Sequence, residues 1–170
     1  KLLLYEVDKN SDILVAKISS RSNEESTQTS SREKGFMEYL SHIGFKGKIH
    51  KYEIESNTKE SAKELAKILE TNSIQGGVMF NSRIYELTNQ LKKINRGERR
   101  IKFIGYDLIE KNIKALKNEE ISFLLSQRSD MQGYNGIKSL SNILLFQKTA
   151  NKVNYMPIDI LVKENIEYYN

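Results

Sequence analysis

The sequence predicts an α/β protein whose parallel sheet carries helices on both faces. Apolar residues alternate along the whole chain between the two-residue rhythm of a strand and the three-to-four-residue rhythm of a helix. Predicted strands are separated by predicted helices rather than by tight turns, which disfavours hairpins. Five strand–helix units in a row therefore imply parallel strands joined by right-handed crossovers.

The first predicted strand covers residues 12–18, "DILVAKI", after a lead-in at residues 1–10. A polar loop follows, and then "REKGFMEYLSHI" at 32–43 has its apolar residues at helical spacing. The remaining elements are predicted in this order: a strand at 48–54, a helix at 58–70, a strand at 74–80, a helix at 83–94, a strand at 101–106, a short helix at 109–118, a strand at 121–126, a long helix at 131–148 and a last strand at 157–162. Thr58 is suited to cap its helix, and Pro157 is suited to begin the last strand.

The net charge of +5 does not by itself predict a nucleic-acid binder, because most basic residues are interspersed with acidic ones. One dense basic stretch, "KKINRGERRIK", covers residues 92–102. It is either a solvated helix end and turn or a contact with DNA or a partner. No recognisable nucleic-acid-binding motif accompanies it, which favours the first interpretation.

Several classes of site and function are disfavoured. The chain has no cysteine, so it has neither disulfides nor thiolate metal ligands. No apolar run approaches the roughly 20 residues that cross a bilayer, so no membrane partner is expected. His42 and His50 are interpreted as surface or loop residues. Motifs of nucleophile elbows, zinc proteases and phosphate loops are missing from the sequence, so we expect no enzyme, no cofactor and no metal site.

Polar side chains follow three of the predicted strands, and a fourth lies in the first predicted helix. Asn81 follows "GGVMF", Asp107 follows "IKFIGY", Gln127 follows "ISFLLS", and Arg32 begins the helix after the first strand. Ligands of open parallel sheets bind beyond the carboxyl ends of the strands. A carboxylate, two amides and a guanidinium suit the hydroxyl groups of a sugar, and Tyr106 is suited to cover its apolar face.

Each of these residues also has a structural interpretation. Asn81 and Asp107 stand where they would cap the following helices, and Arg32 would be a surface charge in a first helical turn. Gln127 is harder to explain in this way, because a polar side chain that leaves so apolar a strand is costly unless it is satisfied.

The same stretches carry a resemblance to a known family. The chain resembles the sugar-binding regulatory domain of lactose-repressor-type (LacI family) transcription regulators, which is itself similar to periplasmic sugar-binding proteins. The resemblance covers nearly the whole chain and rests on five pieces in this order: "SREKGFMEYL", "GGVMFNS", "IKFIGYDL", "ISFLLSQRSDMQGYNGIKSL" and "MPIDILVKENIEYY".

The resemblance implies a periplasmic-binding-protein-like type I fold with an incomplete first lobe. Residues 1–120 would form the C-terminal ligand-binding lobe, 121–157 the crossover strand and helix of a partial N-terminal lobe, and 158–170 a final strand and tail that return to the C-terminal lobe. By residue-for-residue match, Arg32, Asn81, Asp107 and Gln127 would reach into the ligand cleft.

The resemblance also implies the function and the partners. We expect an effector-binding domain for a sugar or sugar phosphate, in a cytoplasmic transcription regulator that contacts operator DNA only through a headpiece that this chain lacks. The alternative is the sugar-binding domain of a periplasmic binding protein or of a membrane sensor kinase. We also expect a homo-oligomer, because an orphaned sheet edge and long helix would be buried against a second copy or folded onto the lobe that is present.

Overall fold

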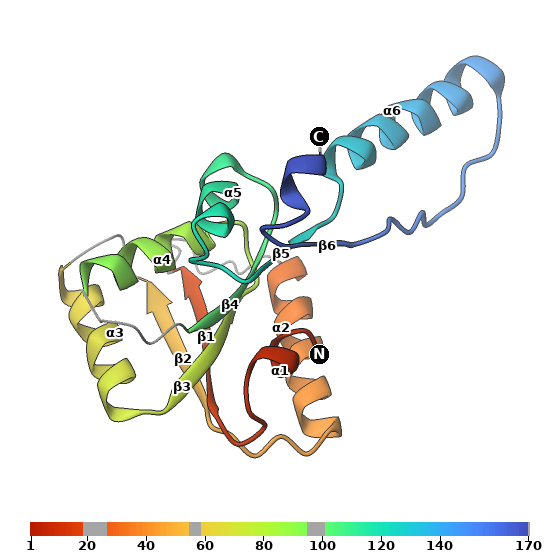
Figure 1. The fold of residues 1–170 in the computed structure, drawn as a ribbon. Helices are drawn as coiled ribbons and strands as arrows, with labels where there is room; N and C mark the ends of the chain where they lie inside the picture. The colour runs from red at the N-terminus through yellow and green to blue at the C-terminus, as the bar shows by residue number, and fades with distance from the viewer. Residues whose placement is uncertain (19–26, 55–58, 95–100, 170) are drawn as a thin grey trace.

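A computed structural model describes residues 1–18, 27–54, 59–94 and 101–169 of the chain (Figure 1). Six strands form one sheet in the order β2-β1-β3-β4-β5-β6. Their bounds are Asp12–Ile18 for β1, Ile49–Ile54 for β2, Ile74–Met79 for β3, Lys102–Tyr106 for β4, Phe123–Ser126 for β5 and Asp159–Leu161 for β6. Strands β1 to β5 run parallel to one another. The predicted α/β class, with its mainly parallel sheet, is confirmed.

The last strand departs from the predicted parallel pattern. Strand β6 pairs antiparallel with β5, with Leu124 opposite Leu161. The chain leaves the sheet after β5 through a long helix and returns as an extended segment from the outer end of that helix (Figure 1). Because this return is not a crossover packed on the sheet, the strand enters from the opposite direction.

The predicted helices are all present, with shifted ends. They are α2 at Thr27–His42, α3 at Lys59–Thr71, α4 at Ile84–Lys93, α5 at Glu110–Lys117 and α6 at Ser129–Phe146. Helix α2 begins five residues before the predicted start, inside the expected polar loop. The predicted N-cap Thr58 lies outside the described residues. Two short elements were not predicted, namely α1 at Leu3–Glu6 and the 3-10 helix η1 at Ile166–Tyr168.

Side chains of alternate strand residues pack into two hydrophobic cores, one on each face of the sheet. On one face, Leu14 and Ala16 of β1 pack in a buried cluster with residues of α3, α4 and α5. On the other face, Ile13 and Val15 pack with α1 and α2. Because successive strand side chains point to opposite faces, the apolar run of β1 is buried on both sides. Figure 1 shows α1 and α2 on one side of the sheet and α3 and α4 on the other.

Strand β3 contains two adjacent glycines where neighbouring groups approach its backbone. A Cβ at Gly77 would lie 2.5 Å from Cε1 of Phe103 and 2.8 Å from the carbonyl oxygen of Leu14. A Cβ at Gly76 would lie 2.8 Å from side-chain carbons of Leu3 and Val7 in and after α1. The lead-in segment therefore packs on the sheet as a short helix instead of remaining extended.

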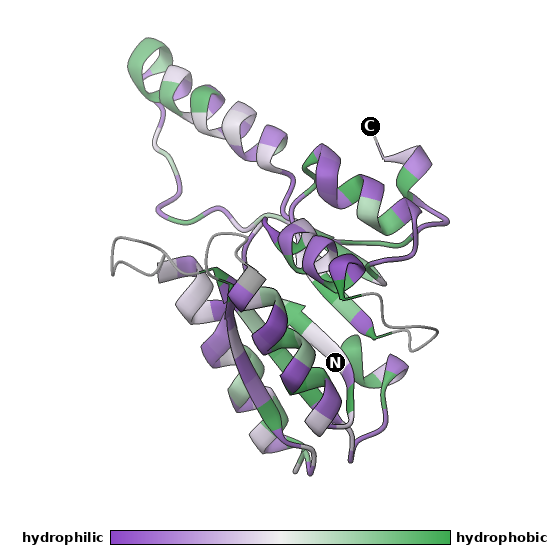
Figure 2. Cartoon of the chain, turned by 90° about the vertical axis from the view of Figure 1, so that its left-hand side faces the viewer, coloured by the Kyte–Doolittle hydropathy of each residue, from purple (hydrophilic) through white to green (hydrophobic). Residues whose placement is uncertain are grey.

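Helix α6 stands away from the sheet, and none of its residues is buried (Figure 1). Hydrophobic and hydrophilic segments alternate along the helix in Figure 2, and Ile137 and Leu145 are 71% and 73% exposed. The edge of β5 is covered by β6, whereas α6 does not fold back onto the lobe. Of the two expected ways to bury the orphaned helix, folding onto the lobe is therefore wrong, and burial against a second copy stays a prediction.

Candidate functional site

The predicted polar residues lie at one edge of the sheet. Strands β3, β4 and β5 are neighbours and run in the same direction, so the turns that follow them begin side by side. These turns carry Asn81, Asp107 and Gln127. Arg32 reaches the same edge from α2, and its contacts with Phe80 and Tyr106 place it beside the turns after β3 and β4. The structure thus places all five predicted residues at the carboxyl edge of the sheet, and their role in ligand binding stays a prediction.

Arg32 is not a surface charge. Its Nη1 donates a hydrogen bond to the carbonyl oxygen of Phe80 at 2.5 Å, and its guanidinium carbon lies 4.1 Å from the centroid of the Tyr106 ring. Its Nη2 is buried and has no hydrogen-bond partner among the described residues. A buried donor without a hydrogen-bond partner destabilises the fold. A ligand oxygen that accepted a hydrogen bond from this nitrogen would remove that cost.

Asp107 has a left-handed backbone, with a φ of 67°. Its amide donates to the carbonyl oxygen of Leu125 at 2.9 Å, which joins the turn to the neighbouring strand β5. Its side chain does not cap α5, because the residue at the N-cap position is Ile109 and has no side-chain cap bond. Instead, its Oδ1 accepts a hydrogen bond from Nε2 of Gln127 at 3.2 Å. The capping interpretation of Asp107 is therefore wrong.

Gln127 connects Asp107 to α2. Its Oε1 accepts a hydrogen bond from Nε2 of Gln28 at 3.0 Å while its own Nε2 donates to Asp107. The Gln132 side chain donates to its backbone carbonyl at 2.7 Å. The polar side chain that leaves β5 is thus satisfied, and the line Gln28–Gln127–Asp107 fixes the orientation of its amide.

Asn81 matches its structural interpretation most closely. Its Oδ1 accepts a hydrogen bond from the amide of Arg83 at 2.9 Å, just before α4 begins. This bond shapes the turn and uses the carbonyl end of the side chain. The amide end of Asn81 is the part that remains to contact a ligand.

Aromatic side chains form a wall beside the polar groups. Phe80 lies between Phe36, at a centroid distance of 5.5 Å, and Tyr106, at 6.3 Å. Burial raises the pKa of the Tyr106 hydroxyl, an effect that the Arg32 charge opposes and the Asp107 carboxylate reinforces. One face of the Tyr106 ring is occupied by Arg32, so only its other face could cover the apolar face of a sugar.

Two pockets adjoin these residues. A pocket of about 280 Å³ between α1, α2 and the sheet is lined in part by Arg32, Phe36, Phe80 and Tyr106. A second, of about 440 Å³, lies between the first turns of α6 and the returning segment and includes Gln127 in its lining. Asn81 and Asp107 line neither of these two pockets.

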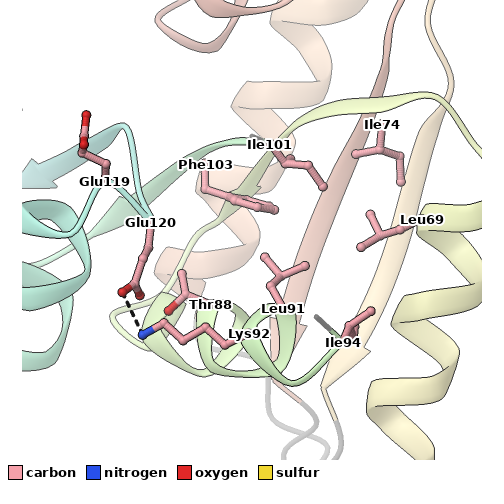
Figure 3. Close-up of a pocket in the computed structure, with 10 residues that line it drawn as sticks. All are labelled: Leu69, Ile74, Thr88, Leu91, Lys92, Ile94, Ile101, Phe103, Glu119 and Glu120. Atoms are coloured by element: carbon pink, nitrogen blue, oxygen red, sulfur yellow. Dashed lines mark ion pairs between the residues drawn. The ribbon is translucent and has the colours of Figure 1, made fainter. Parts of the chain in front are cut away.

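A third pocket, of about 210 Å³, lies near the amino ends of β3 and β4 (Figure 3). Its wall is largely apolar, and Phe103, Ile74 and Leu91 point into it. Lys92 and Glu120 form a 2.7 Å ion pair at its rim. A sugar requires hydrogen-bonding groups on several sides, so the carboxyl edge is the better candidate site.

Histidine and acidic side chains are the residues of this chain that could hold a metal ion. Among the described residues, no group of three or more histidine or acidic side chains is placed to hold a metal ion. His42 ends α2 and is exposed as predicted. His50 was wrongly assigned to the surface or a loop, since it lies in β2 and its Nε2 is 2.9 Å from Oδ2 of Asp12. Strands β1 and β2 are adjacent, and Leu14 is the register partner of His50, so Asp12 lies two residues along β1 on the same face of the sheet.

The basic segment at 92–102 lies mostly outside the described residues, which leave out 95–100. At its two ends, Lys92 pairs with Glu120, and Lys102 pairs with Glu6 at 3.0 Å. These pairs favour a solvated helix end. In the described part of the chain, none of the helices has the length and apolar character needed to cross a membrane.

Sequence reasoning missed two residues of the site, Gln28 and Phe80, and one buried asparagine of α5, Asn112. Gln28 falls in a polar stretch without helical apolar spacing, so nothing indicated that α2 had already begun there. Phe80 was assigned only as a strand residue, and its carbonyl contact with Arg32 has no sequence signal. Asn112 had a signal, because it falls three and four residues before Ala115 and Leu116 on the buried stripe of α5.

The chain matches known proteins both in sequence and in fold. The family model described as "Periplasmic binding protein domain" matches residues 1–148. A protein from Bacteroides fragilis that is assigned as a LacI transcriptional regulator has a solved structure with a TM-score of 0.87 and 32% identity. The match covers 99% of this chain and 58% of that one. A search of curated protein sequences gives no significant match.

Two further solved structures share the fold at lower identity. One is GanP, a glucose-galactose binding protein from Geobacillus stearothermophilus, with a TM-score of 0.75 and 17% identity over 97% of this chain. The other is an ABC transporter solute binding protein from Agrobacterium vitis, bound with alpha-D-tagatopyranose, with a TM-score of 0.74 and 18% identity over 96%. This chain covers 57% and 54% of them. It therefore spans somewhat more than half the length of these solved relatives.

Proposed function

Because the chain belongs to the periplasmic binding protein domain family, we propose that it binds a sugar at the carboxyl edge of its sheet. The observation that carries the proposal is the hydrogen-bonded line Gln28–Gln127–Asp107, which lies beside the guanidinium of Arg32. In this line, Gln127 donates a hydrogen bond to Oδ1 of Asp107 and so holds the carboxylate in place. The other oxygen remains to accept hydrogen bonds from sugar hydroxyls.

The rest of the edge supplies complementary groups. Nη2 of Arg32 is a buried donor without a partner among the described residues, so a ring or hydroxyl oxygen that reached it would relieve an unfavourable state. The amide end of Asn81 is a second donor. Arg32 and Asp107 carry one charge of each sign, and this balance favours a neutral sugar over a sugar phosphate.

We propose that the site is one half of a cleft. Residues 1–120 would form one lobe, 121–157 would cross toward a second lobe, and 158–170 would return. Two observations support this division: α6 leaves the sheet with no buried residue, and the solved relatives are longer than this chain. A ligand held from one side only stays largely solvated, so tight binding would require the second lobe.

We further propose that the sugar is the effector of a LacI-type transcription regulator. The identity of 32% over nearly the whole chain to the Bacteroides fragilis protein supports this assignment. The alternative is the sugar-binding domain of a transporter binding protein or of a sensor kinase, and the two lower-identity relatives favour it. The two alternatives share the site and differ in what the bound sugar controls.

A sugar panel tests the binding proposal. The complete protein would be titrated with neutral pentoses and hexoses and their phosphates, first by thermal shift and then by calorimetry. We expect at least one neutral monosaccharide to raise the melting temperature and bind with a Kd in the micromolar range or below. If none of the sugars stabilises a folded protein, the proposed function is wrong.

A DNA-binding assay distinguishes a transcription regulator from a component of a transporter. The complete protein would be mixed with labelled DNA from upstream of its own gene, with and without the sugar that the panel identifies. A regulator changes its DNA affinity when the sugar binds. Sugar binding without any DNA binding would instead support the transporter or sensor alternative.

A further inference from the structure

Asn112 is a fully buried polar residue in α5, with 0% of its surface exposed. Burial of an amide costs free energy unless its donors and acceptor are all satisfied. An apolar residue at this position would continue the buried stripe that Ala115 and Leu116 form. The presence of asparagine therefore requires a reason beyond packing.

The hydrogen bonds of Asn112 go to the two turns of the candidate site. Its Nδ2 lies 3.0 Å from the carbonyl oxygen of Tyr106 and 3.1 Å from that of Asp107, in the turn after β4. The same nitrogen donates to the carbonyl oxygen of Ser82 at 2.9 Å, in the turn after β3. Its Oδ1 accepts from the amide of Tyr85 at 3.3 Å, at the start of α4. One side chain thus ties together both turns.

These turns carry two of the proposed ligand-binding residues. Asp107 follows β4 with a left-handed backbone, which an L-residue adopts at a cost. A donor on its carbonyl oxygen helps to hold that conformation. Asn81 stands directly before Ser82, and its own side chain is bonded to the amide of Arg83. A shift of either turn would therefore move a binding side chain.

We propose that Asn112 is a positioning residue of the sugar site, which fixes the distance between the Asn81 and Asp107 side chains without touching the sugar. The inference rests on the proposed function, because it assigns a role toward the ligand of that same site. A residue that acts only on stability would lower the melting temperature without changing the affinity of the folded protein. A positioning residue changes both, since small misplacements of contact groups weaken binding strongly.

Gln90 provides a matched control. It is also a buried amide, with 1% of its surface exposed, and it lies in α4. Its hydrogen bonds go to Tyr52 and Ser61, which belong to β2 and α3 and not to the turns of the site. Gln90→Ala should therefore lower stability while leaving sugar affinity within about twofold of the wild type.

The experiment compares Asn112→Ala, Asn112→Ser and Gln90→Ala in the complete protein. Calorimetric titration at a temperature where each variant is folded gives the Kd for the sugar that the panel identifies. We expect Asn112→Ala to weaken binding by about tenfold or more, which corresponds to roughly 1.4 kcal/mol. Asn112→Ser keeps one hydroxyl donor and should fall between Asn112→Ala and the wild type. Equal affinities of Asn112→Ala and Gln90→Ala would overturn the proposal.

Hydrogen exchange tests the positioning without any sugar. The amides of Arg83 and Asp107 report on the turns after β3 and β4. In the wild type we expect both amides to exchange through one opening event with the same free energy, and in Asn112→Ala we expect both to exchange faster. Independent opening of the two turns in the wild type would refute the coupling, even if no Asn112 variant folds. If the turns open together but the wild type binds no sugar, the proposed function fails and the role of Asn112 toward a sugar fails with it.

Discussion

Replacement of Asp107 by asparagine is the sharpest test of the candidate site, because it removes a charge and almost nothing else. Asp107 has a φ of 67°, a left-handed conformation that asparagine also tolerates. The carbonyl oxygen of an asparagine can still accept the hydrogen bond from Gln127. The variant therefore keeps the turn and loses one negatively charged acceptor oxygen.

The expected loss of affinity follows from the bonds removed. A hydrogen bond to a charged group contributes roughly 1.5 to 3 kcal/mol. Loss of one such bond to a sugar hydroxyl corresponds to a roughly 10- to 150-fold increase in Kd. Stability should change little, because the left-handed turn is kept. Asp107→Ala differs in this respect, since alanine lacks the short polar side chain that lets aspartate and asparagine tolerate the left-handed conformation, which otherwise costs an L-residue about 1 to 2 kcal/mol.

The assay is calorimetric sugar titration of Asp107→Asn, Asp107→Gly and Asp107→Ala in the complete protein, with thermal unfolding of each. All three should lose affinity, while only the alanine variant should lose clear stability, because glycine adopts the turn freely. An asparagine variant that binds as tightly as the wild type would show that the Asp107 carboxylate does not contact the ligand. An alanine variant as stable as the glycine variant would show that the turn is not strained.

Four further predictions follow from other contacts. Gln28→Leu removes the donor that orients the Gln127 amide, so it should weaken sugar binding by about fivefold at nearly unchanged stability; an unchanged Kd would contradict this. Gly77→Ala places a Cβ 2.5 Å from Phe103 and should destabilise the fold by about 1 to 3 kcal/mol in denaturant titration. Hydrogen bonds from Arg128, and to a smaller extent from Tyr169, lower the pKa of Asp159 to about 2. A lowered folded-state pKa stabilises the fold above about pH 4 and ceases to do so as the pH falls toward 2, so Asp159→Asn should flatten the acid limb of a stability profile. Ile137→Glu, on the exposed face of α6, should reduce the mass that light scattering reports for the 170-residue chain if that face mediates self-association.

The two kinds of hollow in the molecule contrast in their chemistry. The pocket near the amino ends of β3 and β4 is lined by Phe103, Ile74 and other apolar side chains (Figure 3). The carboxyl edge carries polar side chains instead. Gln127 is hydrogen-bonded to Asp107, and Arg32 contacts Phe80 and Tyr106. The pocket near the amino ends of β3 and β4 could be filled by any apolar group of suitable size. Only the second kind distinguishes one arrangement of hydroxyl groups from another.

The sequence by itself determined the class of the fold and the edge at which to look for a site. The apolar run of β1 and the helical stripe of α4 are local patterns, and local periodicity reports burial directly. Because parallel strands all end at the same edge, the positions of Asn81, Asp107 and Gln127 just after their strands were enough to predict that they lie at one edge of the sheet.

The tertiary structure alone decided how these groups contact one another. The stacking of Arg32 on Tyr106, the line from Gln28 through Gln127 to Asp107, and the antiparallel entry of β6 join residues far apart in the chain. The ties that Asn112 makes to both turns depend on where α5 sits, although its polar character on a buried stripe was visible beforehand. Hydrogen bonds act over about 3 Å and depend on direction, so they are fixed only when packing has set the relative positions of the elements. Periodicity contains no information on those positions.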